Sequence, residues 1–378
     1  MDEVVNFPRL GAGHHILSGL ESCCRIGVFR ALQLGDMLCV VPALRALRQA
    51  APDAHISLIG LPWAESFARR FHRYIDSFFS FPGYPGLPEH PVELSRIPGF
   101  MFVMQEQRFD VLLQLHGSGV LTNPLVASFG AARTAGFFTE GNFCPDARYF
   151  MPWEEKQHEI RRNLQLLSWL GLPAEDDELE FPLEEKDWRR LHECGEKLPP
   201  PGSYVCIHPG ARMPSRRWPA ERFAAVADRL RREGLAVVLT GAKEESELVQ
   251  SVERAMHAKP INLCGRTDLG AFAALVAEAR LVVCNDTGTS HIATAVKTPS
   301  VVISCGSDSR RWAPLDSRRH RTLAADVPCR PCMHQVCPIG HLCADQIDAE
   351  AVYREVCLVL SDNARTDLPA GPFTHISR

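Results

Sequence analysis

The chain has 378 residues, which exceeds one typical domain and fits two domains of roughly 150 to 200 residues. Its 41 Lys and Arg residues against 45 Asp and Glu residues give a net charge of −4, so the chain lacks the basic field that nonspecific nucleic-acid binding requires. No apolar run approaches the roughly 20 residues of a membrane span, and the N-terminus has no basic start followed by an apolar stretch. We therefore expect a soluble, cytoplasmic protein with no nucleic-acid partner.

The first half of the chain predicts a domain of alternating strands and helices. After an N-terminal extension at 1–24, residues 25–60 predict an apolar strand, an amphipathic helix and a second strand. Residues 110–117 predict a further buried strand. This alternation is typical of a doubly wound α/β domain, which we expect to span residues 25–198.

The second half repeats this plan after a stiff linker at 195–203, which contains three consecutive prolines. We expect the second α/β domain at 199–345 and, after it, residues 346–378 as a helix that crosses back to the first domain and a tail. The predicted strands of the second domain are residues 204–208, 235–241, 281–285 and 300–305, and its predicted helices are residues 219–233, 243–257 and a helix after Ser290.

Four loops at predicted strand ends hold the candidate functional residues. The carboxyl ends of parallel strands meet at one edge of a sheet, where open α/β sheets bind their ligands. In the first loop, Asp36 follows Gly35 at the start of a helix. An aspartate at this position can cap the helix or act as a general base aimed into a cleft between the domains, and both interpretations stay open.

The second loop predicts an anion site. It begins with His208 and Gly210, and it places Arg216 and Arg217 just before a helix whose first position is Pro219. Arginine offers permanently charged donors that suit phosphate oxygens. Two adjacent arginines also occur as a solvated surface pair, but the position at a strand end favours function.

The third loop runs from Gly241 to Glu245. A carboxylate after a strand can hold the hydroxyls of a ribose, as it does in nucleotide-binding folds. Glutamates are also common in the first turn of any helix, so this pattern is less specific than the other loops.

The fourth loop joins a buried strand to a helix through Asp286, Thr287 and Gly288. Unpaired backbone N–H groups at the positive end of a helix predict a phosphate site there. Asp286 is suited to shaping the turn or gripping a sugar hydroxyl. His291, one turn into the helix, can reach the same phosphate or fill the core.

Four of the fourteen cysteines form a cluster with the pattern C-x2-C-x4-C-x5-C. Without an export signal, this spacing favours a thiolate metal site over a disulfide framework. Four thiolates suit a structural zinc or iron, and free reduced thiols fit the same pattern. The cluster consists of Cys329, Cys332, Cys337 and Cys343.

At these loops the sequence resembles glycosyltransferase family 9, the bacterial ADP-heptose lipopolysaccharide heptosyltransferases. The resemblance implies a GT-B fold, in which two Rossmann-like domains face each other across a cleft, with the acceptor on the N-terminal side and the nucleotide-sugar on the C-terminal side. The matching segments are residues 25–47, 207–230, 237–245 and 285–314, in the order that the family shows.

The resemblance also implies roles for the candidate residues. Asp36 matches the base that deprotonates the acceptor hydroxyl, and Arg216 matches the cation that neutralises the departing diphosphate. Glu245 matches a ribose contact, and the acceptor loop is expected at Gly35, His116 and Ser118. The donor-binding residues implied in the second domain are His208, Gly210, Arg217, Gly241, Asp286, Thr287, Gly288 and His291.

The implied function is inverting transfer of heptose from ADP-heptose to lipopolysaccharide core or to a related glycan or protein acceptor. No D-x-D motif occurs in the second half, so catalysis is expected to need no cofactor. Peripheral contact with the inner membrane would bring the enzyme to a lipid-linked acceptor, and Arg69, Arg70 and Arg73 form either a basic patch for it or a solvated helix face. A GT-B epimerase or hydrolase, and a nucleotide-sugar binding or assembly protein that forms oligomers, are the alternatives.

Overall fold

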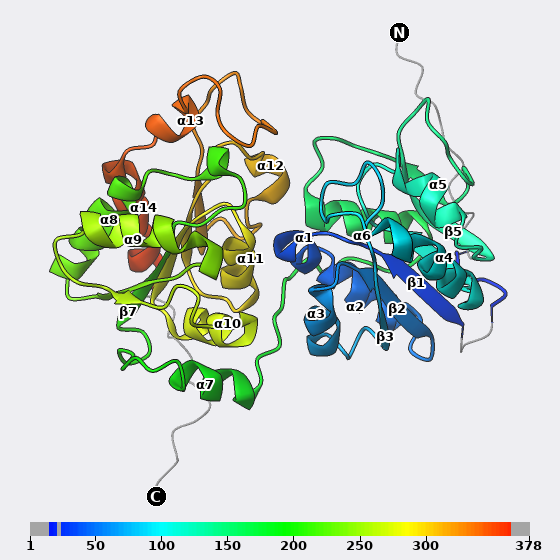
Figure 1. Cartoon of the computed structure of the whole chain (residues 1–378), viewed down its shortest axis with the longest axis horizontal. Helices are drawn as coiled ribbons and strands as arrows, with labels where there is room; N and C mark the ends of the chain where they lie inside the picture. The colour runs from blue at the N-terminus through cyan, green and yellow to red at the C-terminus, as the bar shows by residue number, and fades with distance from the viewer. Residues whose placement is uncertain (1–14, 21–23, 364–378) are drawn as a thin grey trace, which may run out of the picture. The chain divides into compact units, whose positions relative to one another are not determined.

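The structure, a computed structural model, describes residues 15–20 and 24–363. Most of the predicted extension at 1–24 and most of the predicted tail lie outside the described residues. The chain divides into two compact units, an N-terminal unit, Met1–Pro182, and a C-terminal unit, Leu183–Arg378. Each unit is built around one six-stranded sheet (Figure 1). Within the described part of the chain, none of the helices combines the length and apolar character needed to cross a membrane.

The sheet of the N-terminal unit is parallel throughout and has the strand order β3-β2-β1-β4-β5-β6. The central strands are short and buried on both faces, as expected of strands covered by helices on either side. The strands are β1 Arg25–Phe29, β2 His55–Gly60, β3 Ser77–Ser80, β4 Val111–Gln114, β5 Arg133–Phe138 and β6 Phe150–Pro152.

Helices cover both faces of this sheet (Figure 1). Helices α2 and α6 pack against each other, whereas α4 and α5 share a separate apolar core with the other face of the sheet. Phe29 is central to that core, because its ring lies 5.1 Å from Phe81 and 6.1 Å from Phe129. The helical elements are α1 Leu34–Leu38, α2 Val41–Ala50, α3 Ala64–Arg70, η1 Leu94–Arg96, α4 Ile97–Glu106, α5 Thr122–Ala127 and α6 Glu159–Trp169.

The C-terminal unit repeats the architecture with the strand order β12-β11-β10-β7-β8-β9, again all parallel. Its strands are β7 Tyr204–His208, β8 Ala236–Leu239, β9 Ile261–Asn262, β10 Leu281–Asn285, β11 Ser300–Ile303 and β12 His320–Leu323. Its helical elements are α7 Glu185–His192, η2 Pro214–Arg216, α8 Ala220–Arg232, η3 Lys243–Glu245, α9 Ser246–Ala255, α10 Leu269–Glu278, α11 Gly288–Ala295, α12 Ser309–Trp312, α13 Leu342–Asp345 and α14 Ala349–Asn363.

The strand order of the N-terminal sheet, 3-2-1-4-5-6, is that of a Rossmann fold. Strands β7 to β12 take the same places in their sheet as β1 to β6, so the C-terminal unit has this order too. The predicted α/β class with two Rossmann-like, doubly wound units is confirmed. In each sheet the order reverses once, between β1 and β4 and between β7 and β10. The loops after these two pairs of strands diverge, and this topological switch point is where open α/β sheets bind ligands.

Two predicted segments can be placed within the C-terminal unit. The proline-rich segment 195–203 lies inside this unit, after α7, which packs on α10. Helix α14 packs on α8, β11 and β12 of the same unit, and its predicted crossing to the first domain stays a prediction. A stripe of fully buried side chains at Val352, Val356 and Val359 completes the C-terminal core.

The buried His320 makes stability dependent on pH. Burial is the largest cause that lowers its pKa, to about 4; Arg319 lowers it further and Asp316 raises it. The unfolded chain binds this proton below pH about 6.5, so acidification favours unfolding until the pH falls below the folded-state pKa.

We therefore expect His320→Asn to reduce the loss of stability on acidification. Between about pH 7 and pH 5, His320 should contribute about 2 kcal/mol of that loss. Urea unfolding of both proteins at the two pH values measures the difference. An equal pH dependence in the variant and the wild type would contradict the assignment.

Candidate functional site

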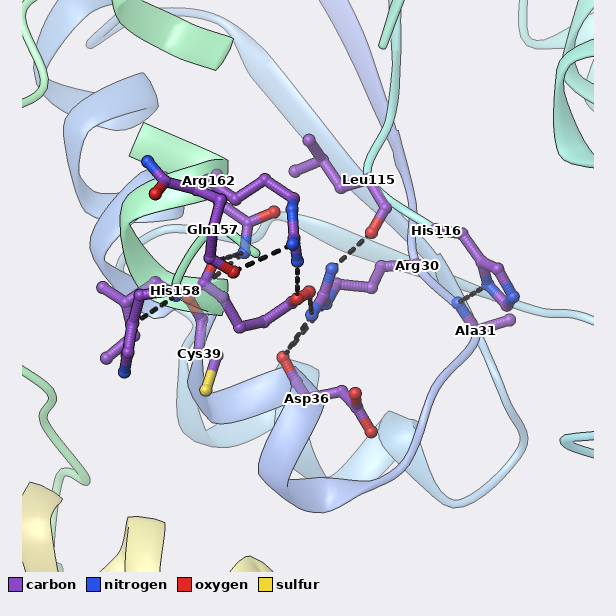
Figure 2. Close-up of polar contacts among 12 residues, drawn as sticks. Arg30, Ala31, Asp36, Cys39, Leu115, His116, Gln157, His158 and Arg162 are labelled. Carbon is purple, nitrogen blue, oxygen red and sulfur yellow. Dashed lines mark hydrogen bonds and ion pairs between the residues drawn. The ribbon is translucent and has the colours of Figure 1, made fainter. Parts of the chain in front are cut away.

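In the N-terminal unit, Asp36 lies at the switch point of the sheet, in the first turn of α1. The N-cap of α1 is Gln33, whose side chain makes no capping hydrogen bond. Asp36 therefore does not occupy the N-cap position. Its backbone carbonyl faces Arg30 and its carboxylate is directed away from that arginine (Figure 2). Asp36 is half-buried, which leaves part of its surface open to solvent.

Arg30, directly after β1, joins the loops at this switch point. Its Nε and Nη2 donate to the carbonyl oxygen of Asp36 at 3.0 and 2.8 Å, and its Nη1 donates to the carbonyl oxygen of Leu115 after β4. Nη2 also donates to Glu159 Oε1 at 3.0 Å. Sequence reasoning missed Arg30 and Glu159, although an arginine that follows an apolar strand directly is a signal for such a role.

His116 belongs to the same group of loops, but it is almost fully buried. Its Nδ1 accepts a hydrogen bond from the Ala31 N–H at 3.2 Å, and its ring stacks on Phe29 at 5.3 Å. The pKa of His116 is lowered to about 3, chiefly by burial and also by the charge of Arg30, while the charge of Glu159 opposes this shift. The imidazole is therefore neutral at physiological pH and orients the loop after β1.

Ser118 and Gly35 flank the same edge of the sheet. Ser118 is half-buried, and its carbonyl oxygen accepts a hydrogen bond from Thr139 Oγ1 at 3.5 Å. The next residue must be glycine, because Gly119 has a φ of +88° and a Cβ there would lie 2.2 Å from the carbonyl oxygen of Phe137. The structure thus gathers the three predicted acceptor residues in the loops that follow β1 and β4.

In the C-terminal unit, the ends of β7 and β8 bring His208, Gly210, Gly241 and Glu245 together. The Glu245 carboxylate lies against Gly210, where a Cβ would approach Glu245 Oε1 to 2.2 Å. Glu245 Oε2 accepts a hydrogen bond from the Ala242 N–H at 2.8 Å and lies 3.8 Å from His208 Nε2. Burial lowers the pKa of His208, and the Glu245 charge opposes this shift.

Arg216 and Arg217 have different surroundings. Arg217 Nε donates to the carbonyl oxygen of Ala211 at 2.9 Å and so fixes its own loop. Arg216 Nε is buried and has no hydrogen-bond partner in the part of the chain that the structure describes. Because leaving a buried donor unpaired costs free energy, Arg216 is the residue suited to receive an anion.

The fourth predicted loop surrounds the N-terminus of α11. Thr287 is the N-cap, and its side chain accepts a hydrogen bond from the Thr289 N–H at 3.2 Å. Asp286 is buried, and its Oδ2 accepts a hydrogen bond from Ser307 Oγ at 2.5 Å. Burial raises the pKa of Asp286, while Ser307 and the charge of Arg216 lower it, so Asp286 and Arg216 interact electrostatically.

The remaining donor candidates in this loop are Gly288 and His291. Gly288 is the first residue of α11, so its backbone belongs to the positive end of the helix. His291 is only 4% exposed, and its ring lies 6.3 Å from that of Trp312. Its placement therefore agrees with a packed residue at the helix start.

Asn285 ties two of these loops together and was missed by sequence reasoning. Its Nδ2 donates to the carbonyl oxygen of Pro209 at 2.7 Å, and its Oδ1 accepts a hydrogen bond from the Trp218 N–H at 3.0 Å. The loop with Arg216 is thus held to the end of β10. The only local signal was a polar residue at the end of an apolar strand.

The four clustered cysteines line one pocket, together with Ser215, His334 and His341. Among residues 15–20 and 24–363, no group of three or more His, Cys, Asp or Glu side chains is placed to hold a metal ion. The geometry gives no support to the predicted zinc or iron. The cysteine-containing segment contacts the loop that carries Arg216, because His341 Nε2 lies 2.8 Å from the carbonyl oxygen of Ser215.

The predicted basic patch, at the end of α3 and just after it, has partners within its own unit. Arg69 pairs with Glu65 at 2.5 Å, and Arg73 pairs with Glu180 at 3.1 Å. The Arg70 guanidinium lies 4.5 Å from the centre of the Phe181 ring. These contacts favour the interpretation of an exposed, paired helix face.

Known proteins share both the sequence and the fold. Residues 103–343 match glycosyltransferase family 9 (heptosyltransferase). Lipopolysaccharide heptosyltransferase 3 of Escherichia coli K12 is 24% identical over 324 residues, which cover 80% of this chain and 88% of that protein. The family 9 glycosyl transferase of Veillonella parvula has a similar structure, with a TM-score of 0.73, 24% identity, and coverage of 90% of this chain and 97% of that one.

A second solved structure, E. coli ADP-heptose lps heptosyltransferase II, has a TM-score of 0.71 and 20% identity, with coverage of 90% of this chain and 99% of the other. The family match spans more than half of the chain and includes Arg216, Glu245 and Asp286. Its breadth, together with the two Rossmann-like sheets, assigns the protein to a class of enzymes. The chain belongs to glycosyltransferase family 9, the heptosyltransferase family, and is a glycosyltransferase.

Proposed function

We propose that the enzyme transfers heptose from ADP-heptose to the lipopolysaccharide core, or to a related glycan or protein acceptor, with inversion at the anomeric carbon. The observation that carries the proposal is Arg216 Nε at the switch point of the C-terminal sheet, which is buried and has no hydrogen-bond partner among residues 15–20 and 24–363. The name of the E. coli relative, a lipopolysaccharide heptosyltransferase, supports the choice of sugar and acceptor.

In this mechanism the Asp36 carboxylate takes the proton of the acceptor hydroxyl. The acceptor oxygen forms a bond to the anomeric carbon as the bond from that carbon to the diphosphate breaks, and ADP leaves with the bonding electrons. One displacement inverts the anomeric centre. The half-buried position of Asp36 in the first turn of α1 is consistent with access to an acceptor.

In this proposal, Arg216 and the N-terminus of α11 stabilise the negative charge that develops on the diphosphate. A guanidinium supplies a fixed charge and N–H donors, and the helix start supplies further N–H donors that are already oriented. Glu245 lies at the end of β8, where a carboxylate suits the ribose hydroxyls. His208 and Gly210 lie against the Glu245 side chain.

The donor assignment is tested by calorimetric titration with ADP-, UDP-, GDP- and CMP-linked sugars. We expect ADP-heptose to bind most tightly and to be consumed when core oligosaccharide is added, with the opposite anomeric configuration in the product. A preference for another nucleotide would contradict the ADP-heptose assignment.

Contact with the inner membrane belongs to the same proposal, and co-sedimentation with anionic vesicles tests it.

For Asp36 we expect Asp36→Asn to lower kcat by at least about 100-fold, because the isosteric amide cannot accept the proton. The Kd for ADP-heptose should stay within about 2-fold of wild type, since the residue acts on the acceptor. Asp53→Asn, at an exposed position in the same unit, is the control and should keep full activity. Turnover at the wild-type rate in Asp36→Asn would refute its role as the base.

For Arg216 we expect Arg216→Ala to lower kcat by about 100- to 1,000-fold, the range typical for removal of one group that stabilises a developing anion. Arg216→Lys should recover part of this loss, because it restores the charge but not the planar donors. Arg212→Ala, in an exposed part of the same loop, serves as the control. Equal activities of the Arg216→Ala and Arg212→Ala variants would exclude the proposed role.

A further inference from the structure

Three charged residues are buried together beside α1: Arg30, Glu159 and Arg162 are 1%, 2% and 1% exposed. Glu159 Oε1 accepts a hydrogen bond from Arg30, and Oε2 accepts one from Arg162. Two cations thus share one anion. Burying ions costs several kcal/mol each, and a single carboxylate cannot satisfy all the N–H donors of two guanidinium groups.

Arg162 uses its other donors within its own segment. Its Nη2 donates to the carbonyl oxygens of Glu154 and Gln157, at 2.9 Å each, and its guanidinium lies 3.9 Å from the centre of the Trp153 ring. All of these partners precede α6 in the chain. Arg162 therefore serves mainly to stabilise the entry into α6, and none of these contacts reaches α1.

Arg30 uses its remaining donors on the loops of the switch point. Two of its N–H groups converge on the carbonyl oxygen of Asp36, and a third reaches the carbonyl oxygen of Leu115 at the end of β4. In Figure 2 the guanidinium of Arg30 lies between the carbonyl groups of Asp36 and Leu115. The first turn of α1 is thus bonded to the sheet through one side chain.

Helix α1 needs such support, because it has only five residues and no side-chain N-cap. A helix this short is not stable on its own. The carbonyl that Arg30 holds belongs to Asp36 itself, so the bond fixes the backbone from which the carboxylate projects. The carboxylate itself points away from Arg30 (Figure 2).

We propose that Arg30, anchored by Glu159, is the positioning residue for Asp36, and that it sets the direction of the carboxylate through the backbone of α1. This inference rests on the proposed function, since it assumes that Asp36 is the base. Arg30 touches neither substrate in this scheme. Its contribution is the geometry of the proton transfer, where a shift of about 1 Å can cost about 100-fold in rate.

The test compares Arg30→Lys with Arg162→Lys. Both replace an arginine that is 1% exposed and bonded to Glu159, and both keep the charge. Lysine cannot reach the Asp36 carbonyl, the Leu115 carbonyl and Glu159 together. We expect Arg30→Lys to lower kcat by about 10- to 100-fold with an unchanged Kd for ADP-heptose, and Arg162→Lys to keep kcat within about 3-fold of wild type.

Hydrogen–deuterium exchange of the peptide that covers α1 gives a second measurement. The Met37 and Cys39 N–H groups, bonded to Gln33 and Gly35, should exchange faster in Arg30→Lys but not in Arg162→Lys. If Arg30→Lys does not fold, Glu159→Asp replaces it, because the shorter carboxylate keeps the charge and weakens the anchor. It should also lower kcat at unchanged donor affinity.

The outcomes separate the inference from the proposed function. In the Asp36→Asn background, Arg30→Lys should cause no further loss of kcat, because both changes act on one step. Suppose that Asp36→Asn is inactive. Equal kcat values for Arg30→Lys and Arg162→Lys then overturn the inference alone, and so does a wild-type kcat for Glu159→Asp. A fully active Asp36→Asn overturns both.

Discussion

The functional architecture depends on one constraint, the parallel pairing of every strand in both sheets. Parallel strands need crossover connections, so all loops at the carboxyl edge are free to carry functional side chains. The order reverses once in each sheet, between β1 and β4 and between β7 and β10. Consecutive connections then leave in opposite directions, and the edge at that point is not covered by a helix. Asp36 follows β1 and Arg216 follows β7, the first strand of each of these pairs.

The switch-point arginines of the two units differ in their hydrogen-bond partners. In the N-terminal unit, Arg30 has carbonyl and carboxylate partners that rigidify the loops. In the C-terminal unit, Arg216 Nε is buried with no partner within the described residues, although Asn285 ties the loop of Arg216 to the end of β10. Hydrogen bonds that are already made hold a fixed geometry, whereas an unpaired buried donor gains free energy when an anion arrives. Under the proposed mechanism, Arg30 holds the segment that carries the base and Arg216 binds the diphosphate.

The sequence predicted the strands and loops whose signals are local. Apolar runs with a glycine or an aspartate after them located Asp36, Asp286 and the edge of each sheet. Arg30 and Glu159 are 129 residues apart, so no window of sequence reveals their contact. Helix α14 shows a related limit: its valine stripe predicts that it packs, but not against which elements. The parts that escaped prediction are those fixed by tertiary pairing rather than by periodicity.

The cysteine-rich segment shows how a sequence motif can act on a site through its backbone. Its Cys332 N–H donates to the carbonyl oxygen of Gly306 at 2.9 Å, and its Gln335 carbonyl accepts a hydrogen bond from the Ser215 N–H at 3.1 Å. Arg330 Nη2 donates to Ser304 Oγ at 3.1 Å, and that serine contacts Asp286. The segment therefore braces the loops of both Arg216 and Asp286. Because these contacts run through carbonyl, N–H and hydroxyl groups, the support they give does not require a metal on the thiols.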